Sequence, residues 1–538
     1  MGSCIGTTEG RTVVDVLTLA AFTALYVGIL LAISFIAYRR TKKGEDYLLA
    51  GRKVHPAIIG LSYGSTFIST SAIVGFGGVA AQLGMGIIWL TVLCIGVGVL
   101  IAFIVYGKRT RRIGQRLGAV TLPDLLAKRY NSNFLQYGTS VIILASMPLY
   151  SSAVLIGGSR FIETTLGIDY TTALLGFALI TALYVVFGGI LAVMYTDAFQ
   201  GGIMVFGMVA ILIITYVTLG GVTGAHQELT DMASLVPAGL AGQGMTGWTS
   251  MPELGSPIWF TLITTIVMGV GIGVLAQPQL VVRYMTAKDD RSLNRAIPVG
   301  GLFILLCTGV AFTVGALTNV YFYRENGVIS TSMVSGNIDQ IIPLFINTAM
   351  PDVVVILFML TLLAAAMSTL SALFHSMGSA AGHDLWTHLG SCRLMPSSIR
   401  KERTGDCSSL RANRTGTTIM IAVSIGLAFL MPGSIIARAT AMFMGLSAAA
   451  FLPLFTLAIF SERPSVLAAK LSLAVGTGTW FLWTAFVHIK ESSVLGISKA
   501  LFGTDAVLAS PWTVVDPLVI ALPASVIALI IGVLLDKR

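Results

Sequence analysis

The sequence predicts an all-α polytopic membrane protein. Of its 538 residues, 55% are apolar and only 11% are charged, and the mean hydropathy is +0.87. So few charges cannot cover a water-facing surface, and most of the surface must therefore face lipid. The runs Val16–Tyr38 and Gly84–Tyr106 are each 23 residues long without a charge, which is enough to cross a hydrocarbon core of about 30 Å. In lipid such runs form helices, because every backbone group must bond within its segment.

Thirteen charge-free stretches are long enough to be candidate spans. The first is followed by Arg39 and Arg40, a stop-transfer pattern, so we expect an anchor and not a signal peptide. A basic loop over 383–414 is the longest inner connection, and we expect it to be solvated. The predicted spans are 16–38, 57–81, 84–106, 134–159, 171–190, 198–221, 257–282, 296–323, 353–382, 415–437, 439–461, 471–489 and 517–535.

The basic residues predict how these spans are oriented in the plasma membrane. With the N-terminus outside and the loops alternating, 27 of the 33 Lys and Arg residues fall on the inner side, in keeping with the positive-inside rule. This count places Arg283 in an inner loop and the C-terminus in the cytoplasm. The net charge of +9 is therefore explained by orientation among membrane lipids, and not by nucleic-acid binding.

The sequence offers no signature of an enzyme. Its five cysteines are scattered and odd in number, so they show neither metal nor disulfide spacing. We find no paired-histidine metal motif, no Ser/His/Asp set that can be placed, and no phosphate-binding glycine loop. Nothing in the sequence indicates an obligate protein partner either. We therefore expect a non-enzymatic membrane protein.

Two of the predicted spans contain residues that weaken a membrane helix. The span 57–81 carries Gly75, Gly77 and Gly78 beside a string of hydroxyl residues, and the span 257–282 carries three glycines before Gln277-Pro278-Gln279. Such interruptions are tolerated where the freed backbone lines a cavity. The two spans enter from opposite sides, and a matched pair of this kind is typical of an inverted-repeat transporter with its site at mid-membrane. The alternative is that the small residues only allow close helix packing.

The ninth span carries hydroxyl groups on one face. Ser368, Ser371 and His375 lie on the same side of a helix, and Thr369 flanks them. Hydroxyl and carbonyl oxygens can replace the hydration shell of a hard cation such as sodium. The alternative is that these hydroxyls bond back to their own helix or to a neighbouring one. We expect His375 to be a buried, neutral, hydrogen-bonded histidine rather than a proton relay.

Asp197 stands at the start of the predicted span 198–221. An ionisable residue near the membrane interior indicates a functional site by default. An aspartate also suits a helix N-cap, where it complements the helix dipole. The residue types alone leave these two interpretations equally open.

Three runs make the chain similar to the sodium/solute symporter family. They are Tyr184–Met204, which contains Asp197, then Gln277–Lys288, and Ala364–Ser371. The resemblance extends over nearly the whole chain and is closest to the proline, pantothenate and monocarboxylate branches. It implies a leucine-transporter-type inverted repeat with five plus five core helices. The implied division is an extra helix in 1–38, a first repeat in 57–221, a second repeat in 257–461 and two further helices in 462–538.

The resemblance also implies the residues that bind sodium, the coupling ion. The main site would take its ligands from two carbonyls of the broken first core helix and from three groups of the eighth. A second site, which some family members have, would contain an aspartate and serines, but one of its serines is Ala372 here. The implied ligands are Ser65, Ile68, Ala365, Ser368 and Thr369 for the main site, and Asp197, Ser368 and Ser371 for the second.

The expected function is sodium-coupled import of a small organic solute by alternating access. The solute would be a carboxylate such as pantothenate, lactate, pyruvate or acetate, or an amino acid such as proline. Proline carriers of the family have an aspartate where this chain has Phe67, and this departure disfavours proline. Proton coupling through Asp197 or His375, a channel, and a membrane sensor are the alternatives. The implied solute contacts are Ser69, Thr70, Ser71 and Gln277.

Overall fold

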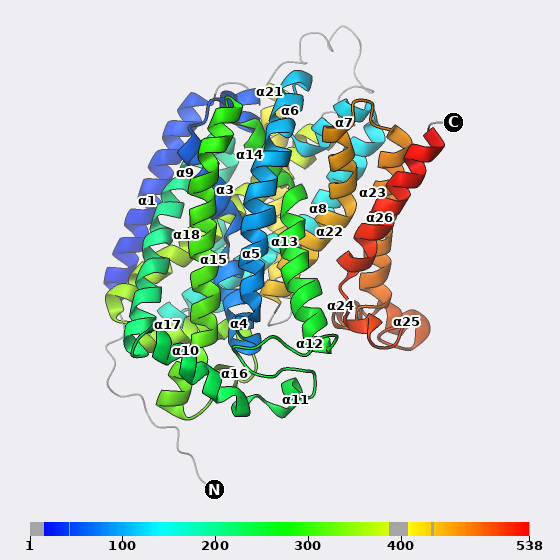
Figure 1. The fold of residues 1–538 in the computed structure, drawn as a ribbon. Helices are drawn as coiled ribbons and strands as arrows, with labels where there is room; N and C mark the ends of the chain where they lie inside the picture. Colours follow the sequence, from blue (N-terminus) through cyan, green and yellow to red (C-terminus); the bar gives the residue numbers. More distant parts are fainter. Residues whose placement is uncertain (1–15, 42–43, 387–406, 432–434, 537–538) are drawn as a thin grey trace.

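The structure, a computed structural model, describes residues 16–41, 44–386, 407–431 and 435–536. Within these ranges it is a bundle of long helices running between two ends, where shorter helices gather (Figure 1). The described residues pair in strand-like fashion at one isolated parallel bridge, between Val54 and Ala287. Residues 1–15 of the first predicted segment and residues 387–406 of the predicted basic loop lie outside the described ranges.

Eleven described helices are long and apolar enough to cross a membrane. A further span is the bent pair Pro56–Phe67 and Ser71–Leu83, whose two parts meet at 53°. The helix Tyr170–Val186 is apolar but shorter, and it corresponds to the predicted span 171–190. The chain is thus a multi-pass helical membrane protein, as predicted. The count of thirteen holds only roughly, because this short helix is less than a full span.

The helices differ in length according to their place. The long ones are α1 (Val16–Arg40), α5 (Ile88–Ile95) with its continuation through Gly96–Gly107 into α6 (Lys108–Leu117), α8 (Asn133–Leu166), α9 (Tyr170–Thr218), α15 (Asp290–Asn326), α18 (Asp352–Ser379), α21 (Cys407–Leu430), α22 (Ile436–Phe460), α23 (Val466–Phe486) and α26 (Pro517–Asp536). Short helices at the ends are α2 (Gly44–Leu49), α7 (Leu122–Tyr130), α10 (Val222–Asp231), α11 (Ala238–Ala241), α16 (Ser330–Met333), α17 (Ile341–Ala349), α24 (Ile489–Leu495) and α25 (Ile497–Phe502).

Both spans that were predicted to be interrupted are broken. The first consists of α3 (Pro56–Phe67), a non-helical stretch, and then Ser71–Gly75 leading into α4 (Phe76–Leu83). The second runs from α12 (Pro257–Phe260) through α13 (Gly269–Gly273) to Ala276. There Gln277 is extended, and Pro278 begins α14 (Pro278–Met285), because proline suits the first turn of a helix and disfavours the helical state of the residue before it.

The glycines of these spans stay helical and serve close packing instead. A Cβ on Gly78 would lie 2.2 Å from the carbonyl oxygen of Ile338, and one on Gly273 would lie 2.4 Å from that of Met444. The first break falls on the hydroxyl string at Ile68–Thr70, where Ile68 has φ −88° and ψ 102°. The packing interpretation therefore holds for these glycines, while polar residues and Pro278 mark the breaks.

Two predicted boundaries are wrong. α9 turns at Gly189 (φ 64°, ψ −171°), so its second half begins there and not at residue 198; glycine adopts this conformation without a Cβ penalty. α21 ends at Leu430 and α22 begins at Ile436, whereas the sequence placed this boundary near 438. The run of residues around this boundary carries no charge, so the end of α21 could not be located from the charge pattern. Pro432 and Gly433 in the sequence are nevertheless turn signals.

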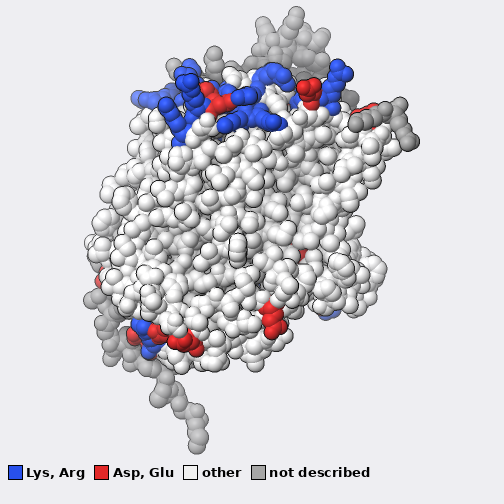
Figure 2. All heavy atoms as spheres, viewed as in Figure 1, with Lys and Arg blue, Asp and Glu red and all other residues white. Residues whose placement is uncertain are grey.

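Charged and apolar side chains are separated on the surface. Figure 2 shows lysine and arginine gathered at the end that carries α6 and α7, above a broad middle that is nearly free of charge. Exposed large apolar residues include Phe206 and Leu302, at 72% and 67% exposure, as expected of side chains that face lipid. At the centre, residues 361–375 of α18 are all buried, and α18 packs along α9, α8 and α21.

Candidate functional site

The break after α3 turns backbone carbonyls towards α18. Because α3 ends at Phe67, the carbonyls of Ser65 and Thr66 no longer meet the N–H groups of a following helical turn. The hydroxyl of Ser368 lies 2.8 Å from the Ser65 carbonyl oxygen, and the hydroxyl of Thr369 donates to the Thr66 carbonyl oxygen at 3.0 Å. Side chains of one helix thus satisfy the backbone of the other.

This contact brings together most of the residues predicted for the main sodium site. The Ser368 hydroxyl also lies 3.2 Å from the Ala365 carbonyl, so Ser65, Ala365 and Ser368 share one small volume. Thr369 faces Thr66 and not Ile68, whose own N–H donates to Gly64 at 2.8 Å. Thr66 is therefore a residue that the resemblance missed. Its position one residue after Ser65 in the hydroxyl string was the feature of the sequence that could have identified it.

The donor set suits a small, hard, monovalent cation. The groups at this contact are uncharged hydroxyl and carbonyl oxygens, and the residues that carry them are at most 1% exposed. Oxygen ligands of this type can replace the water shell of such an ion. The described residues contain no cluster of three or more His, Cys, Asp or Glu side chains that would favour a transition metal instead. Sodium is a cation of this kind, so the donor set would suit it.

A buried ion pair lies beside this contact. The Asp197 carboxylate and the Arg283 guanidinium are both 0% exposed, with Nη2 of Arg283 2.8 Å from Oδ2 of Asp197. The hydroxyls of Ser62 and Thr66 donate to the same carboxylate oxygen at 2.8 and 3.1 Å. The Ser371 hydroxyl lies 3.2 Å from the other oxygen, Oδ1. The charges are thus paired and hydrogen-bonded, as buried charges must be.

The guanidinium is held by hydrogen bonds of its own. Nε of Arg283 donates to the Ser62 hydroxyl at 3.0 Å, Nη1 donates to the Gln279 carbonyl, and Nη2 donates to the Thr66 hydroxyl. Together with the contacts of Asp197, these bonds join four elements, namely α3, α9, α14 and α18. Among the ion pairs of the described residues, this is the one in which neither side chain is exposed at all.

Two sequence-based interpretations need correction here. Asp197 is not a helix N-cap, because α9 continues on both sides of it and its second half begins eight residues earlier, at Gly189. Arg283 does not lie in an inner loop, because it belongs to α14 and is fully buried. A charge at the end of an apolar run looks like a loop residue in the sequence. Its position five residues after Pro278, which opens a new helix, was the available signal.

A small central cavity of about 290 Å³ lies beside the first break, and one of the four predicted solute contacts lines it. Of the four, Ser69 is among the residues lining it, and the Tyr150 hydroxyl donates to Ser69 at 3.3 Å. Thr70 turns its hydroxyl to the Val154 carbonyl at 3.1 Å. Gln277 is paired with Gln279 within the second break. The wall of the cavity is mostly apolar and includes Phe67.

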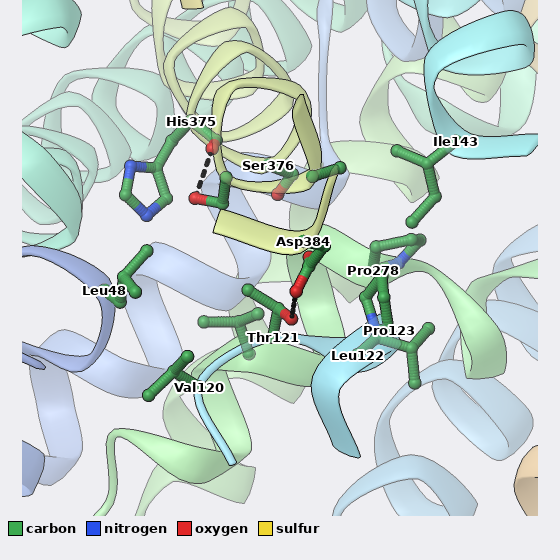
Figure 3. Close-up of a pocket in the computed structure, with 13 residues that line it drawn as sticks. Leu48, Val120, Thr121, Leu122, Pro123, Ile143, Pro278, His375, Ser376 and Asp384 are labelled. Atoms are coloured by element: carbon green, nitrogen blue, oxygen red, sulfur yellow. Dashed lines mark hydrogen bonds between the residues drawn. The ribbon is translucent and has the colours of Figure 1, made fainter. Parts of the chain in front are cut away.

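A second cavity lies towards the basic end of the bundle and has a volume of about 300 Å³. Figure 3 shows His375 and Ser376 of α18 on one side of it, with Val120 and Thr121 opposite. Thr121 donates to Asp384 at 2.9 Å. The His375 ring packs on Tyr47, with centroids 5.3 Å apart. The predicted burial of His375 is confirmed, and its Nδ1 has no hydrogen-bond partner within the described residues.

A third and larger cavity, of about 630 Å³, lies on the other side of the central one. Three helical segments line both, with residues one turn apart: Phe76 and Val79, Val270 and Ile266, and Met444 and Ala441. The two cavities therefore follow one another along the same helices. The larger one is also lined by His488, Lys490 and Glu491 at the start of α24, which lies at the end opposite α6 and α7 (Figure 1).

Comparison with known proteins points to one family. Residues 47–476 match the profile of the sodium:solute symporter family. The chain is 29% identical to a sodium/pantothenate symporter of Haemophilus influenzae, over 89% of this chain and 94% of that protein. It is 26% identical to a sodium/proline symporter of Escherichia coli, over 86% of this chain and 87% of that protein.

A solved structure shares the fold. A Na+-coupled sialic acid symporter, in a substrate-bound outward-open state, matches with a TM-score of 0.68 and covers 96% of this chain and 97% of that chain. Its sequence is 19% identical, so the likeness concerns the fold alone. The predicted leucine-transporter-type architecture, with its two broken core helices, is thereby confirmed.

Proposed function

This chain belongs to the sodium:solute symporter family, and from that premise we propose that it imports a small carboxylate together with sodium. The chain is a multi-pass, sodium-coupled solute symporter. The proposal concerns its ion site, its solute and its orientation. The observation that carries it is the contact between hydroxyls of α18 and backbone carbonyls at the break after α3.

Sodium is proposed to bind at this contact. Its ligands would be the carbonyls of Ser65, Ile68 and Ala365 with the hydroxyls of Ser368 and Thr369. At this contact α3 and α18 meet through hydroxyl–carbonyl hydrogen bonds, each of which contributes only about 1 kcal/mol. An ion that draws oxygens from both helices holds them together more firmly. Sodium binding would thus favour one arrangement of the broken helix, and this preference couples the ion to alternating access.

The central cavity supports a carboxylate over an amino acid. The residues that line it include no charged side chain, and Phe67 stands in its wall, where proline carriers of the family have an aspartate. An ammonium group would therefore be buried there without a counter-charge, which is costly. A carboxylate instead suits the start of the helical segment Ser71–Leu83, because helix N-termini attract anions. Ser69, Thr70, Ser71 and Gln277 remain the proposed solute contacts.

The larger cavity would be the entrance for this solute. Its charged lining residues are Arg438, Lys490 and Glu491. Nε of Arg438 lies 4.0 Å from Oε1 of Glu491. Among the described residues, Lys490 forms no ion pair with a carboxylate of this cavity. Burial, with Lys490 and Arg438 nearby, lowers the pKa of His488 to about 3, so this residue is neutral. The entrance carries a net positive charge, which attracts anions from solution.

The proposed orientation follows from the two ends of the bundle. Lysine and arginine gather at the end with α6 and α7 (Figure 2), which would lie in the cytoplasm. The N-terminus would then be outside, the C-terminus inside, and the entrance cavity would face the exterior of the plasma membrane. Residues 57–221 and 257–461 would form the two repeats, with 1–38 and 462–538 as added helices.

Uptake by right-side-out vesicles tests the proposal. Vesicles containing the full chain would be offered labelled pantothenate, lactate, pyruvate, acetate or proline in sodium, potassium or choline medium. We expect uptake of a carboxylate in sodium medium only. Uptake driven by a proton gradient without sodium would instead support coupling through Asp197 or His375. Uptake of proline but of no carboxylate would contradict the proposed solute, and vesicles without the chain provide the background.

A further inference from the structure

The Asp197–Arg283 ion pair occupies the place where a second sodium ion would bind. The implied second site consists of Asp197, Ser368 and Ser371, and α9 and α18 bring these residues together. Oδ2 of Asp197 already accepts hydrogen bonds from Arg283, Ser62 and Thr66. The Ser371 hydroxyl lies 3.2 Å from Oδ1 and 2.9 Å from the Ser368 carbonyl. The carboxylate therefore has a full set of partners, one of which is a cation.

The charge of the guanidinium bears directly on cation binding. An arginine remains protonated in proteins, so the buried carboxylate is already neutralised by Arg283. A sodium ion at Oδ1 would be a second positive charge beside the same carboxylate, and in a poorly polarisable interior the two cations would repel each other strongly. Ala372 removes one of the oxygens that would offset this repulsion.

Several hydrogen bonds hold the guanidinium of Arg283 beside Asp197. Three of its nitrogens are hydrogen-bonded, and they reach Ser62, Thr66, Asp197 and the Gln279 carbonyl. The Gln279 carbonyl belongs to the same short helix, α14, that carries Arg283. The backbone of Arg283 is thus fixed within α14, and its guanidinium is fixed by hydrogen bonds beside Asp197.

We propose that Arg283 is the permanent counter-cation of Asp197 and takes the place of a second sodium ion, so that this chain binds one sodium. The proposal rests on the proposed function for the main site between α3 and α18. It goes beyond that function by assigning a role to Arg283 and by stating the number of coupling ions.

Equilibrium binding of ²²Na⁺ to the purified, detergent-solubilised chain tests this without knowledge of the solute. We expect one sodium ion per chain in the native protein. We expect two in Arg283→Gln, because the freed carboxylate becomes a sodium ligand, and one in Arg283→Lys, which keeps the charge. The double variant Arg283→Gln with Asp197→Asn should return to one. A native protein that binds two ions, and one after Asp197→Asn, would overturn the proposal.

The remaining outcomes are also decisive. One ion in a folded Arg283→Gln variant would show that the guanidinium is not what excludes the second ion. If that variant fails to fold, native protein and the double variant Arg283→Gln with Asp197→Asn decide, since neither leaves an unpaired buried charge and both should bind one ion. A native protein that binds no sodium would contradict the proposed main site, and that result is distinct from the binding of two ions.

Discussion

At the scale of single residues, Thr66 links the two parts of the site. Its carbonyl accepts a hydrogen bond from Thr369, and its hydroxyl contacts both Asp197 and Arg283. One residue thus touches the proposed sodium site through its backbone and the ion pair through its side chain. A displacement of Thr66 would affect both. Removing one partner of a buried ion pair costs about 3–5 kcal/mol, so single substitutions of Asp197 or Arg283 should destabilise the protein.

Thr369→Ala is predicted to weaken sodium binding. The variant removes one of about five oxygens and leaves the others in place. Loss of a buried polar partner costs about 1–3 kcal/mol, which corresponds to a rise of roughly 5- to 150-fold in the half-saturating sodium concentration. Sodium-dependent uptake or ²²Na⁺ binding measures this quantity.

The matched control for this substitution is Thr361→Ala in the same helix. The hydroxyl of Thr361 bonds back to the Leu357 carbonyl at 2.8 Å, so its loss should leave the sodium dependence unchanged. A well-folded Thr369→Ala protein with native sodium dependence would refute the assignment of Thr369 as a ligand.

At the scale of helices, breaks and close contacts are made by different residues. The first break lies at Ile68–Thr70, where the hydroxyls of Ser69 and Thr70 find partners in α8, and the second lies at Gln277 before Pro278. Gly273 remains helical and faces Met444 of α22. The broken helices can therefore pack tightly against their neighbours at some turns and open their backbone at others. This combination places carbonyl oxygens inside the membrane without exposing them to lipid.

Gly273→Ala is predicted to destabilise the protein by about 1–3 kcal/mol, because the new methyl group would overlap the Met444 backbone. Gly309→Ala in α15 is the control. Nothing lies within 4 Å of its added Cβ, and alanine favours a helix by up to about 1 kcal/mol over glycine. Thermal unfolding in detergent should show a lower midpoint for the first variant and an equal or higher one for the second. Equal stability of Gly273→Ala and the native chain would contradict the packing argument.

Much of this arrangement could be predicted from the sequence, for identifiable physical reasons. Long charge-free runs have few structural options in lipid, so most spans were predicted correctly, apart from the short helix Tyr170–Val186 and boundaries such as the turn at Gly189. Helical spacing correctly placed Ser368 and Thr369 in the buried interior. The partner of Asp197 was missed, because Arg283 follows it by 86 residues. Pairing between distant helices leaves no local pattern, and a charge at the end of an apolar run resembles a loop.

At the scale of the whole molecule, charge and cavities are arranged along one axis. Basic residues crowd the end proposed to be cytoplasmic (Figure 2). The cavity of about 630 Å³ lies towards the opposite end, in line with the smaller central one. Arg438 and Lys490 line this entrance, although lysine and arginine are otherwise concentrated at the other end. A positive cavity at the end proposed to face the exterior would favour recruitment of an anionic solute.

Arg438→Gln and Lys490→Gln are each predicted to lower kcat/KM for uptake of the anionic solute by a factor of about 3 to 10 at low ionic strength. The effect should shrink as salt screens the charges. Lys499→Gln, in α25, is the control, because Lys499 is exposed and does not line the cavity. Uptake rates measured across a range of ionic strength test this. An equal loss at all salt concentrations would contradict electrostatic attraction as the cause.

The proposed replacement of a second sodium ion by Arg283 has a consequence for the energetics of uptake. One sodium ion travelling with one monovalent carboxylate moves no net charge, so the membrane voltage neither drives nor opposes the loaded step. The voltage contribution of about 2.3 kcal/mol per charge at 100 mV is then not available. A tenfold sodium gradient supplies about 1.4 kcal/mol, enough for about tenfold accumulation. Such a carrier is suited to rapid uptake from surroundings rich in its solute, and much less to scavenging traces against a steep gradient.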